Sequence, residues 1–412
     1  MIQGILLAAL LGLAAPAAAA ETGDEGAATD WPAMITRLQR EASERPGAAA
    51  TRQELATAYN NYGVSLGNEG QWAQAIQQLQ EALRLDRDNA RFQDNLAKLH
   101  LNQAHEAYGQ HQLAQALQAV ERALELDPEL AHGYALLGEI QYQRQQLKDA
   151  KAAWERAVAL DPSLTAVAAR LEQVDRELPV ESTFERLSQA YFDVRYDEEL
   201  QRPAGFDVRD ALLRARREVG SDFAYWPKYK LIVLVYRPEQ FHGLGHPDWI
   251  AGKFDGKIRM PLPGAQMPPA LVTQILFHEY THALIHDLAK GRCPAWLNEG
   301  LAEYEGRSQL QGRVDRLAEA VAQDQLIPWQ ELSAAIGPDQ PAERMALAYE
   351  QSYSLAAYLI DRYAFWRIRR ILKALGEGQP WESVLASELR IKLPRLESYW
   401  RQSLPDFLAA HS

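Results

Sequence analysis

Small and bulky apolar residues recur at fixed offsets between positions 56 and 164 of this 412-residue chain. An alanine is followed four positions later by a bulky apolar residue and three positions after that by another alanine, in patterns that begin at Ala75, Ala116 and Ala150. Offsets of four and seven place these side chains on one face of a helix. The pattern therefore predicts three helical hairpins that bury their apolar faces against one another.

The period of these units resembles that of tetratricopeptide repeats, which is about 34 residues. The second and third units are in register at this period, while the first and second are separated by seven additional residues, enough for about two helical turns. We expect an α-solenoid of three repeats plus a capping helix (165–178) over residues 51–178, with a boundary at Leu178-Pro179. The resemblance implies that a protein or peptide partner binds the concave groove. The alternative is that the repeats only scaffold or shield the rest of the chain.

Residues 179–412 mix strand and helix patterns. The apolar, β-branched run 230–236 predicts a buried strand. The turn signal Asp255-Gly256, between residues 249–254 and 257–262, predicts a hairpin. Apolar spacing and helix-breaking residues predict helices over about 179–201, 208–219, 269–288, 295–304 and 348–359. We therefore expect an α+β domain with a small sheet and a helical C-terminal part.

The segment from His278 to His282 has the most specific chemistry in the chain. These two histidines lie four positions apart within a predicted helix, so their imidazoles lie one turn apart on the same face and can bind one Zn²⁺. Glu279 then lies beside the metal. It can take a proton from a water molecule and later deliver it to a leaving amine. The pattern predicts a metallohydrolase.

A catalytic zinc ion has three protein ligands, and the next predicted helix offers two candidates for the third. Residues 291–294 break the first helix, and an antiparallel second helix can return a carboxylate to the metal. Glu299 is the preferred ligand. Glu303 lies one turn later on the same face and could ligate instead, but we assign it to orienting a ligand histidine. The simplest alternative for either residue is a solvated glutamate.

Residues 278–282 and 296–302, with Asn298-Glu299-Gly300 in the second segment, together resemble the gluzincin group of peptidase MA-like metallopeptidases. This group includes thermolysin-like proteases and large zinc aminopeptidases. The resemblance implies a zincin-like peptidase domain over 179–412, with Zn²⁺ as the cofactor and Glu299 as its third ligand. The connector between His282 and Glu299 is slightly shorter than in the best-known branches, which indicates a distinct and smaller branch.

The same resemblance implies further site residues. Family members use a tyrosine or histidine to stabilise the oxyanion of the reaction, and we expect Tyr353 in this role with Tyr349 as the second candidate. Either tyrosine could instead be a packing residue of an amphipathic helix. The edge strand of the small sheet pairs with extended substrate, which implies contacts from Gly252, Lys253 and Phe254. The chain lacks a segment like the aminopeptidase anchor for a free amino terminus, so an endopeptidase is favoured.

Residues 1–20 form an apolar, alanine-rich run that is too short for a stable membrane span and ends in small residues. This run predicts a cleavable secretory signal and thus a periplasmic or secreted protein. Residues 21–50 are expected to form a polar leader or linker around a short amphipathic piece. The net charge of −12, without a basic stripe, argues against a nucleic-acid partner.

Four other residues of metal-ligating types are not assigned to the site. Cys293 is the single cysteine, which precludes an intramolecular disulfide, and we expect it to be structural. His242 and His246 repeat the four-residue spacing, but the glycines and proline around them predict a loop. His286 extends the histidine face of the helix by another turn, too far to reach the same ion.

These predictions converge on a zinc-dependent peptidase that hydrolyses exported proteins or peptides, with the repeats recruiting a substrate or a partner. Two other functions stay open. The repeats could be the functional part of an assembly factor whose peptidase domain is inactive, although intact ligands and base count against this. A quality-control factor could need both halves, with the repeats delivering clients to the peptidase.

Overall fold

The structure is a computed structural model that describes residues 29–247, 251–262, 267–308, 313–337 and 339–411. The chain divides after Pro179 into two compact units, here called the repeat unit and the C-terminal unit. The predicted secretory signal, residues 1–20, lies outside the described residues. No helix in the described part of the chain is long and apolar enough to cross a membrane.

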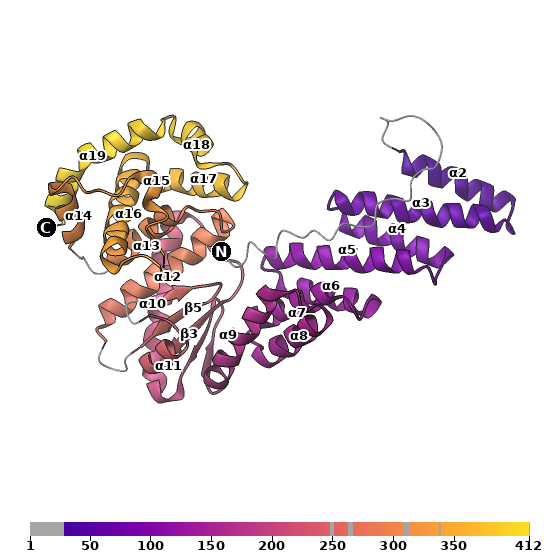
Figure 1. Ribbon diagram of the computed structural model, residues 1–412, viewed down its shortest axis with the longest axis horizontal. Helices are drawn as coiled ribbons and strands as arrows, with labels where there is room; N and C mark the ends of the chain where they lie inside the picture. Colours follow the sequence, from indigo (N-terminus) through magenta and orange to yellow (C-terminus); the bar gives the residue numbers. More distant parts are fainter. Residues whose placement is uncertain (1–28, 248–250, 263–266, 309–312, 338, 412) are drawn as a thin grey trace. The chain divides into compact units, whose positions relative to one another are not determined.

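The repeat unit consists of helices joined by short turns (Figure 1). All nine residues of the recurring apolar pattern are fully buried, as their helical spacing predicts. The helices are α2 (Trp31–Glu44), α3 (Ala49–Asn68), α4 (Trp72–Leu85), α5 (Ala90–Gly109), α6 (Leu113–Leu126), α7 (Ala131–Gln143), α8 (Leu147–Leu160) and α9 (Thr165–Glu181). The expected helical repeat architecture is confirmed.

Two details of the repeat unit bear on the sequence predictions. The seven additional residues lengthen a helix, because α5 has 20 residues where its counterpart α7 has 13. Part of the predicted leader is instead packed structure, since Ile35 and Leu38 of α2 are buried in one cluster with Leu55 and Tyr59 of α3. An amphipathic helix that can bury its apolar face on a neighbour does not behave as a free linker.

The C-terminal unit contains a five-stranded sheet in the order β1-β2-β3-β5-β4. Its strands are β1 (Glu185–Ser188), β2 (Phe192–Tyr196), β3 (Leu231–Tyr236), β4 (Lys253–Phe254) and β5 (Ile258–Pro261). Strand β3 is central and pairs in parallel with β2 and β5, whereas β1 and β4 are antiparallel edge strands. The predicted strand over 230–236 is confirmed as β3.

The predicted helix over 179–201 is wrong. The sequence there forms β1 and β2, followed by a short 3-10 helix, η1 (Glu198–Leu200). Strands of four and five residues are too short to show a clear period of two, and β2 is buried at nearly every position because it lies inside the sheet. Pairing with β3 decides the conformation, and this contact between distant segments has no local signal.

The hairpin predicted around Asp255-Gly256 is present as β4 and β5, which are joined by a three-residue loop rather than a two-residue turn. Gly256 has φ of +100°, a conformation that favours glycine. Trp249 and Ile250, which the sequence places at the start of the first strand, lie outside the described residues.

Helices make up the rest of the C-terminal unit, and α12, α13, α16 and α19 follow one another away from β4, each in contact with the next (Figure 1). The predicted helices over 208–219, 269–288, 295–304 and 348–359 are confirmed within longer elements. The helices are α10 (Gln201–Phe223), α11 (Pro238–Gly243), α12 (Pro269–Ala289), α13 (Ala295–Arg307), α14 (Asp315–Ala322), α15 (Trp329–Leu332), α16 (Ala342–Tyr363), α17 (Phe365–Gly376), α18 (Trp381–Val384) and α19 (Leu393–Ala410). The expected α+β domain with a small sheet is confirmed.

Candidate metal and catalytic site

Helix α12 places both histidines of the motif on one face. It begins with Pro269 and ends at Ala289, and the next residue, Lys290, adopts a left-handed conformation with φ of +50° before Gly291. Because one turn separates His278 from His282, their ring centroids lie 4.7 Å apart and their Nε2 atoms 3.0 Å apart. Two ring nitrogens thus converge on one point.

Helix α13 brings the third candidate ligand to the same point. It starts directly after Pro294 and packs against α12. The Glu299 Oε2 atom lies 3.6 Å from His278 Nε2 and 3.5 Å from His282 Nε2. The three side chains predicted as ligands therefore come together, although they belong to two helices.

The donor set fits a single divalent cation. A tetrahedral zinc ion with ligand bonds of about 2.0–2.2 Å has ligand atoms about 3.3–3.6 Å apart. The three separations between the candidate ligand atoms, 3.0, 3.5 and 3.6 Å, are close to these ligand–ligand distances. Among the described residues of the C-terminal unit, His278, His282 and Glu299 form such a group, with one ligand atom from each. The residues that would hold a metal are thus already in place.

The charge states of His278, His282 and Glu299 depend on one another. Burial by itself raises the pKa of Glu299, but the two histidines outweigh this and hold it far below its ordinary value. Burial lowers the pKa of His282, but the Glu299 carboxylate outweighs this and raises it to about 9. Because a ligand histidine must be neutral, binding of a cation has to displace protons from this cluster.

Glu279 lies beside the three ligands and is 3 % exposed. Its Oε2 atom has no hydrogen-bond partner within the described part of the chain. Burial raises the pKa of Glu279, although His278 and His282 oppose the shift. A buried carboxylate oxygen without a partner is costly in a native protein, so it commonly marks a place where a water molecule, an ion or a substrate binds. A raised pKa also suits a general base that works near neutral pH.

Two further residues of α13 contact the histidines. Glu303 Oε1 lies 3.4 Å from His278 Nδ1, and its Oε2 accepts a hydrogen bond of 2.7 Å from Arg307 Nε. The side chain of Asn298 adjoins His282 and favours its charged form. Glu303 is thus placed as expected for a carboxylate that orients a ligand histidine. The contribution of Arg307 was not predicted, although its position four residues after Glu303 was a signal.

The two candidate tyrosines lie one turn apart on α16 but have different surroundings. Burial, the negative charges of Glu299 and Glu303, and a hydrogen bond to Glu299 raise the pKa of Tyr349, so its hydroxyl stays protonated and can donate. The Tyr353 hydroxyl instead lies 2.9 Å from His411 Nε2, and its ring packs on Arg307. The geometry therefore favours Tyr349, the second candidate, over Tyr353 for contact with the site.

Gly300 explains how α16 comes so close to the ligands. A Cβ atom at Gly300 would lie 2.2 Å from the Ser352 carbonyl oxygen, so any side chain there would push α16 away. Ser352 lies between Tyr349 and Tyr353 in the sequence. The absence of a side chain at Gly300 thus allows the Tyr349 hydroxyl to reach the Glu299 carboxylate.

The predicted substrate contacts lie on or beside the edge strand. Gly252 lies directly against Glu279, because a Cβ there would fall 2.6 Å from its Oε1. Lys253 is half exposed, with its Nζ 3.9 Å from Asp255 Oδ2. The Phe254 ring packs on His286, with centroids 5.8 Å apart. The structure brings Gly252 to the base, whereas Phe254 faces the next turn of α12.

The residues that were not assigned to the site have other surroundings. Burial, with the charge of Glu299, raises the pKa of the Cys293 thiol, which keeps it protonated at neutral pH. The His242 Nδ1 atom lies 3.2 Å from the His246 carbonyl oxygen, and no candidate metal group among the described residues includes either histidine.

Two families of known proteins match parts of the chain. The Peptidase MA superfamily matches residues 269–406, and the TPR repeat matches residues 66–103. The search of curated proteins gave no significant match. The C-terminal unit thus carries a Peptidase MA superfamily domain and the repeat unit a TPR repeat, in the expected order. Members of this superfamily are typically metal-dependent, which agrees with the geometry of the three ligands.

Proposed function

We propose that this chain, with its Peptidase MA superfamily domain, is a zinc-dependent peptidase whose metal is held by His278, His282 and Glu299. The observation that carries the proposal is the convergence of these side chains at tetrahedral ligand spacings beside the unpartnered Glu279 carboxylate. Nitrogen and carboxylate ligands in this number are typical of catalytic zinc sites. A bound Zn²⁺ supplies Lewis acidity, which polarises a carbonyl and acidifies water.

Three side chains of the protein perform the proton transfers and positioning. Glu279 takes the proton of the attacking water and passes it to the amine that leaves, as base and then acid. The Tyr349 hydroxyl donates a hydrogen bond to the oxyanion that develops on the peptide carbonyl. Glu303 holds the His278 ring through Nδ1, which keeps Nε2 directed at the ligand cluster.

Zinc analysis combined with proteolysis tests this function. Unfolded casein serves as the substrate for the wild type, Glu279→Gln and Glu299→Ala, and Glu343→Gln changes an exposed glutamate as the matched control. We expect Glu279→Gln to retain zinc without cleavage, Glu299→Ala to lose zinc, and the control to resemble the wild type. A wild type that binds no zinc, or normal cleavage by Glu279→Gln, would overturn the proposal. The superfamily includes inactive members, so a zinc-loaded wild type without activity would favour the assembly-factor alternative.

The mode of cleavage and the localisation of the protein are part of the same proposal. We propose internal cleavage of extended chains, because the edge strand β4 flanks the base and can pair with substrate backbone. An amino-terminally blocked peptide should therefore be cut. The apolar run over residues 1–20 supports export to the periplasm or outside the cell. The amino terminus of protein recovered from that compartment should follow Ala20.

The repeat unit is proposed to recruit the protein substrate or a partner. TPR repeats suggest protein–protein interaction, because stacked helix pairs form an extended concave surface. A fragment ending at Pro179, added in excess to the full-length protein, should compete for substrate and slow cleavage. Cleavage that is unaffected by the fragment would support the alternative of a scaffold.

A further inference from the structure

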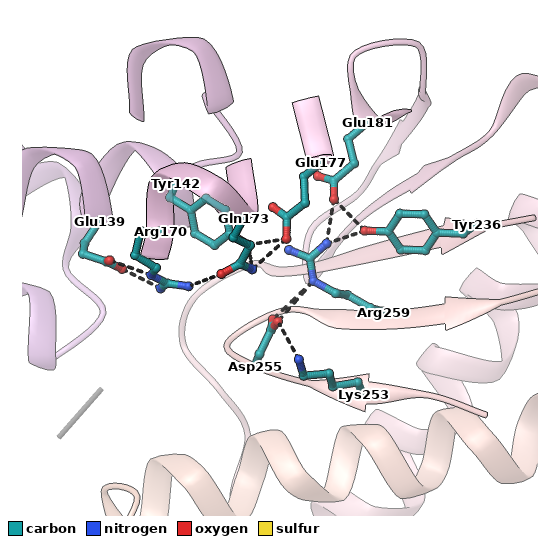
Figure 2. A network of polar contacts seen from close by, with 10 residues as sticks. All are labelled: Glu139, Tyr142, Arg170, Gln173, Glu177, Glu181, Tyr236, Lys253, Asp255 and Arg259. Atoms are coloured by element: carbon teal, nitrogen blue, oxygen red, sulfur yellow. Dashed lines mark hydrogen bonds and ion pairs between the residues drawn. The ribbon is translucent and has the colours of Figure 1, made fainter. Parts of the chain in front are cut away.

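Arg259 of β5 and Glu181, the last residue of α9, form an ion pair in the interior of the C-terminal unit. Their side chains are 0 % and 1 % exposed, and Arg259 Nη1 lies 2.6 Å from Glu181 Oε1. The Tyr236 hydroxyl donates a hydrogen bond of 2.6 Å to the same oxygen and contacts Arg259 Nη1, as Figure 2 shows. A charged pair at this depth is held in one geometry.

Burying such a pair is costly, so stability alone does not account for it. Each ion loses several kcal/mol of hydration, and apolar residues of the same size often replace buried pairs without loss of stability. Lys257, which is also fully buried, adds a second positive charge close to Glu181. Burial by itself raises the pKa of Glu181, but Arg259 and Lys257 outweigh this and lower it, so the carboxylate is charged. Glu181 therefore balances positive charge beneath the edge of the sheet.

The other end of Arg259 reaches the hairpin that flanks Glu279. Arg259 Nε lies 3.2 Å from Asp255 Oδ2, in the loop between β4 and β5 (Figure 2). In the sheet, Arg259 is also the register partner of Lys253 in β4. Strand β4 has only two residues and one neighbouring strand, so few backbone hydrogen bonds hold it. Its position thus depends on side-chain contacts, which include the packing of Phe254 on His286 and the contact of Arg259 with the loop that follows the strand.

We propose that the Glu181–Arg259 pair is a positioning device that fixes the edge strand β4, and with it Gly252, beside Glu279. The proposal rests on the proposed function, because it assigns the pair to the binding of substrate along this strand. Glu181 and Arg259 act through Asp255 and the strand and do not touch the reacting atoms. Their removal should loosen the strand and weaken substrate binding without removing the metal ligands.

Amide hydrogen exchange of the full-length protein tests this directly, and Glu181→Gln is the main variant. The expected result is at least tenfold faster exchange in residues 252–258, with zinc content and exchange in α12 unchanged. With casein-derived peptides, KM should rise several-fold more than kcat falls. Tyr236→Phe removes the hydroxyl that bonds to both Glu181 and Arg259 but removes no charge. It should give a smaller change in the same direction and covers the case in which Glu181→Gln does not fold.

A matched control lies in the repeat unit. Arg170 and Glu139 form a bidentate ion pair, in which Nε and Nη2 of the arginine each lie 2.8 Å from a carboxylate oxygen (Figure 2). Their side chains are 14 % and 5 % exposed. Glu139→Gln should leave exchange in residues 252–258 and the KM unchanged. Unchanged exchange in 252–258 in folded Glu181→Gln, or equal acceleration throughout β2, β3 and β5, would overturn the positioning role. Hydrogen exchange can be measured whether or not the protein is active. An inactive wild type would therefore contradict the proposed function but not the positioning role.

Discussion

Gly252 lies directly against the carboxylate of Glu279: a Cβ at this position would fall 2.6 Å from Oε1 and 2.9 Å from Cγ. The two residues belong to different elements, since Gly252 precedes β4 and Glu279 lies in the middle of α12. Their contact joins the edge strand to the proposed general base. In the proposed function, a peptide that pairs with β4 would therefore lie within reach of the Glu279 carboxylate.

Replacement of Gly252 by alanine should impair catalysis without loss of metal. The added methyl group must displace the Glu279 side chain, and a base displaced by about 1 Å can cost on the order of 100-fold in rate. We expect kcat/KM to fall by about 10- to 100-fold while zinc content stays normal. Gly243→Ala is the control, because a Cβ there meets nothing within 4 Å. Wild-type activity in Gly252→Ala would show that Glu279 is free to move.

Removal of the Tyr349 hydroxyl should lower kcat strongly. This group adjoins Glu299, and in the proposed function it donates to the oxyanion of the peptide carbonyl. Loss of one such donor typically costs about 100- to 1,000-fold. Steady-state kinetics of Tyr349→Phe measure the effect. Tyr353→Phe is the matched control, since it breaks the contact with His411 and should cost about 1 kcal/mol of stability with kcat retained. A larger kcat loss in Tyr353→Phe would instead identify Tyr353 as the donor.

Neutralisation of Glu303 should weaken zinc binding. Its Oε1 lies 3.4 Å from His278 Nδ1, and partners of this kind typically contribute about 10- to 100-fold in metal affinity. Competition with a chelator gives the affinity of Glu303→Gln. Glu397→Gln also breaks a glutamate–arginine pair at four-residue spacing, but on α19, and should bind zinc normally. Equal affinities for both variants would mean that Glu303 only pairs with Arg307.

The convergence of the three candidate metal ligands was predictable because its signal is local. His278 and His282 lie on one helical face, and a helix break followed by a second helix brings back Glu299. The choice between Tyr349 and Tyr353 was not predictable, because both positions are one turn apart on α16. It depends on how α16 packs against α13, and the close approach of Gly300 to the Ser352 carbonyl is one contact of this packing.

Strands β1 and β2 were not predictable from local sequence either. Residues 185–196 lack a run long enough to show strand periodicity, and β2 is defined by its pairing with β3, some 40 residues away in the sequence. The repeat helices, by contrast, could be predicted closely because each apolar position recurs at a fixed offset. Local periodicity thus located the helices and the motif, whereas contacts between distant segments decided the sheet and the tyrosine.

A side chain at Gly300 should destabilise the C-terminal unit. The obstacle is the Ser352 backbone, because a Cβ at Gly300 would lie 2.2 Å from its carbonyl oxygen, and a helix backbone cannot move aside as a flexible side chain does. We expect Gly300→Ala to cost about 3 kcal/mol or more in the free energy of unfolding. Gly306→Ala should cost less, since the nearest backbone atom to a Cβ there is 3.2 Å away. Urea unfolding compares the two, and equal stabilities would contradict the close packing of α13 and α16.

The buried carboxyl of Glu305 should make stability fall as pH rises. Glu305 is 3 % exposed, and burial, with the charges of Asp222 and Glu218, raises its pKa from an ordinary 4.5 to about 8. Below pH 4.5 the group is protonated in both the folded and the unfolded chain. Between pH 4.5 and 8 the unfolded chain loses the proton first, so stability decreases by up to about 1.4 kcal/mol per pH unit.

Glu305→Gln removes this titration, because an amide stays neutral over the whole range. Relative to the wild type, the variant should therefore gain stability steadily from pH 5 to pH 8 and gain little more above pH 8. Urea unfolding at several pH values gives the difference. Glu319→Gln, at an exposed position of α14, should follow the wild type throughout. A constant difference between Glu305→Gln and the wild type from pH 5 to pH 8 would mean that Glu305 is charged in the folded protein, which would require a positive partner or water at its buried Oε1 atom.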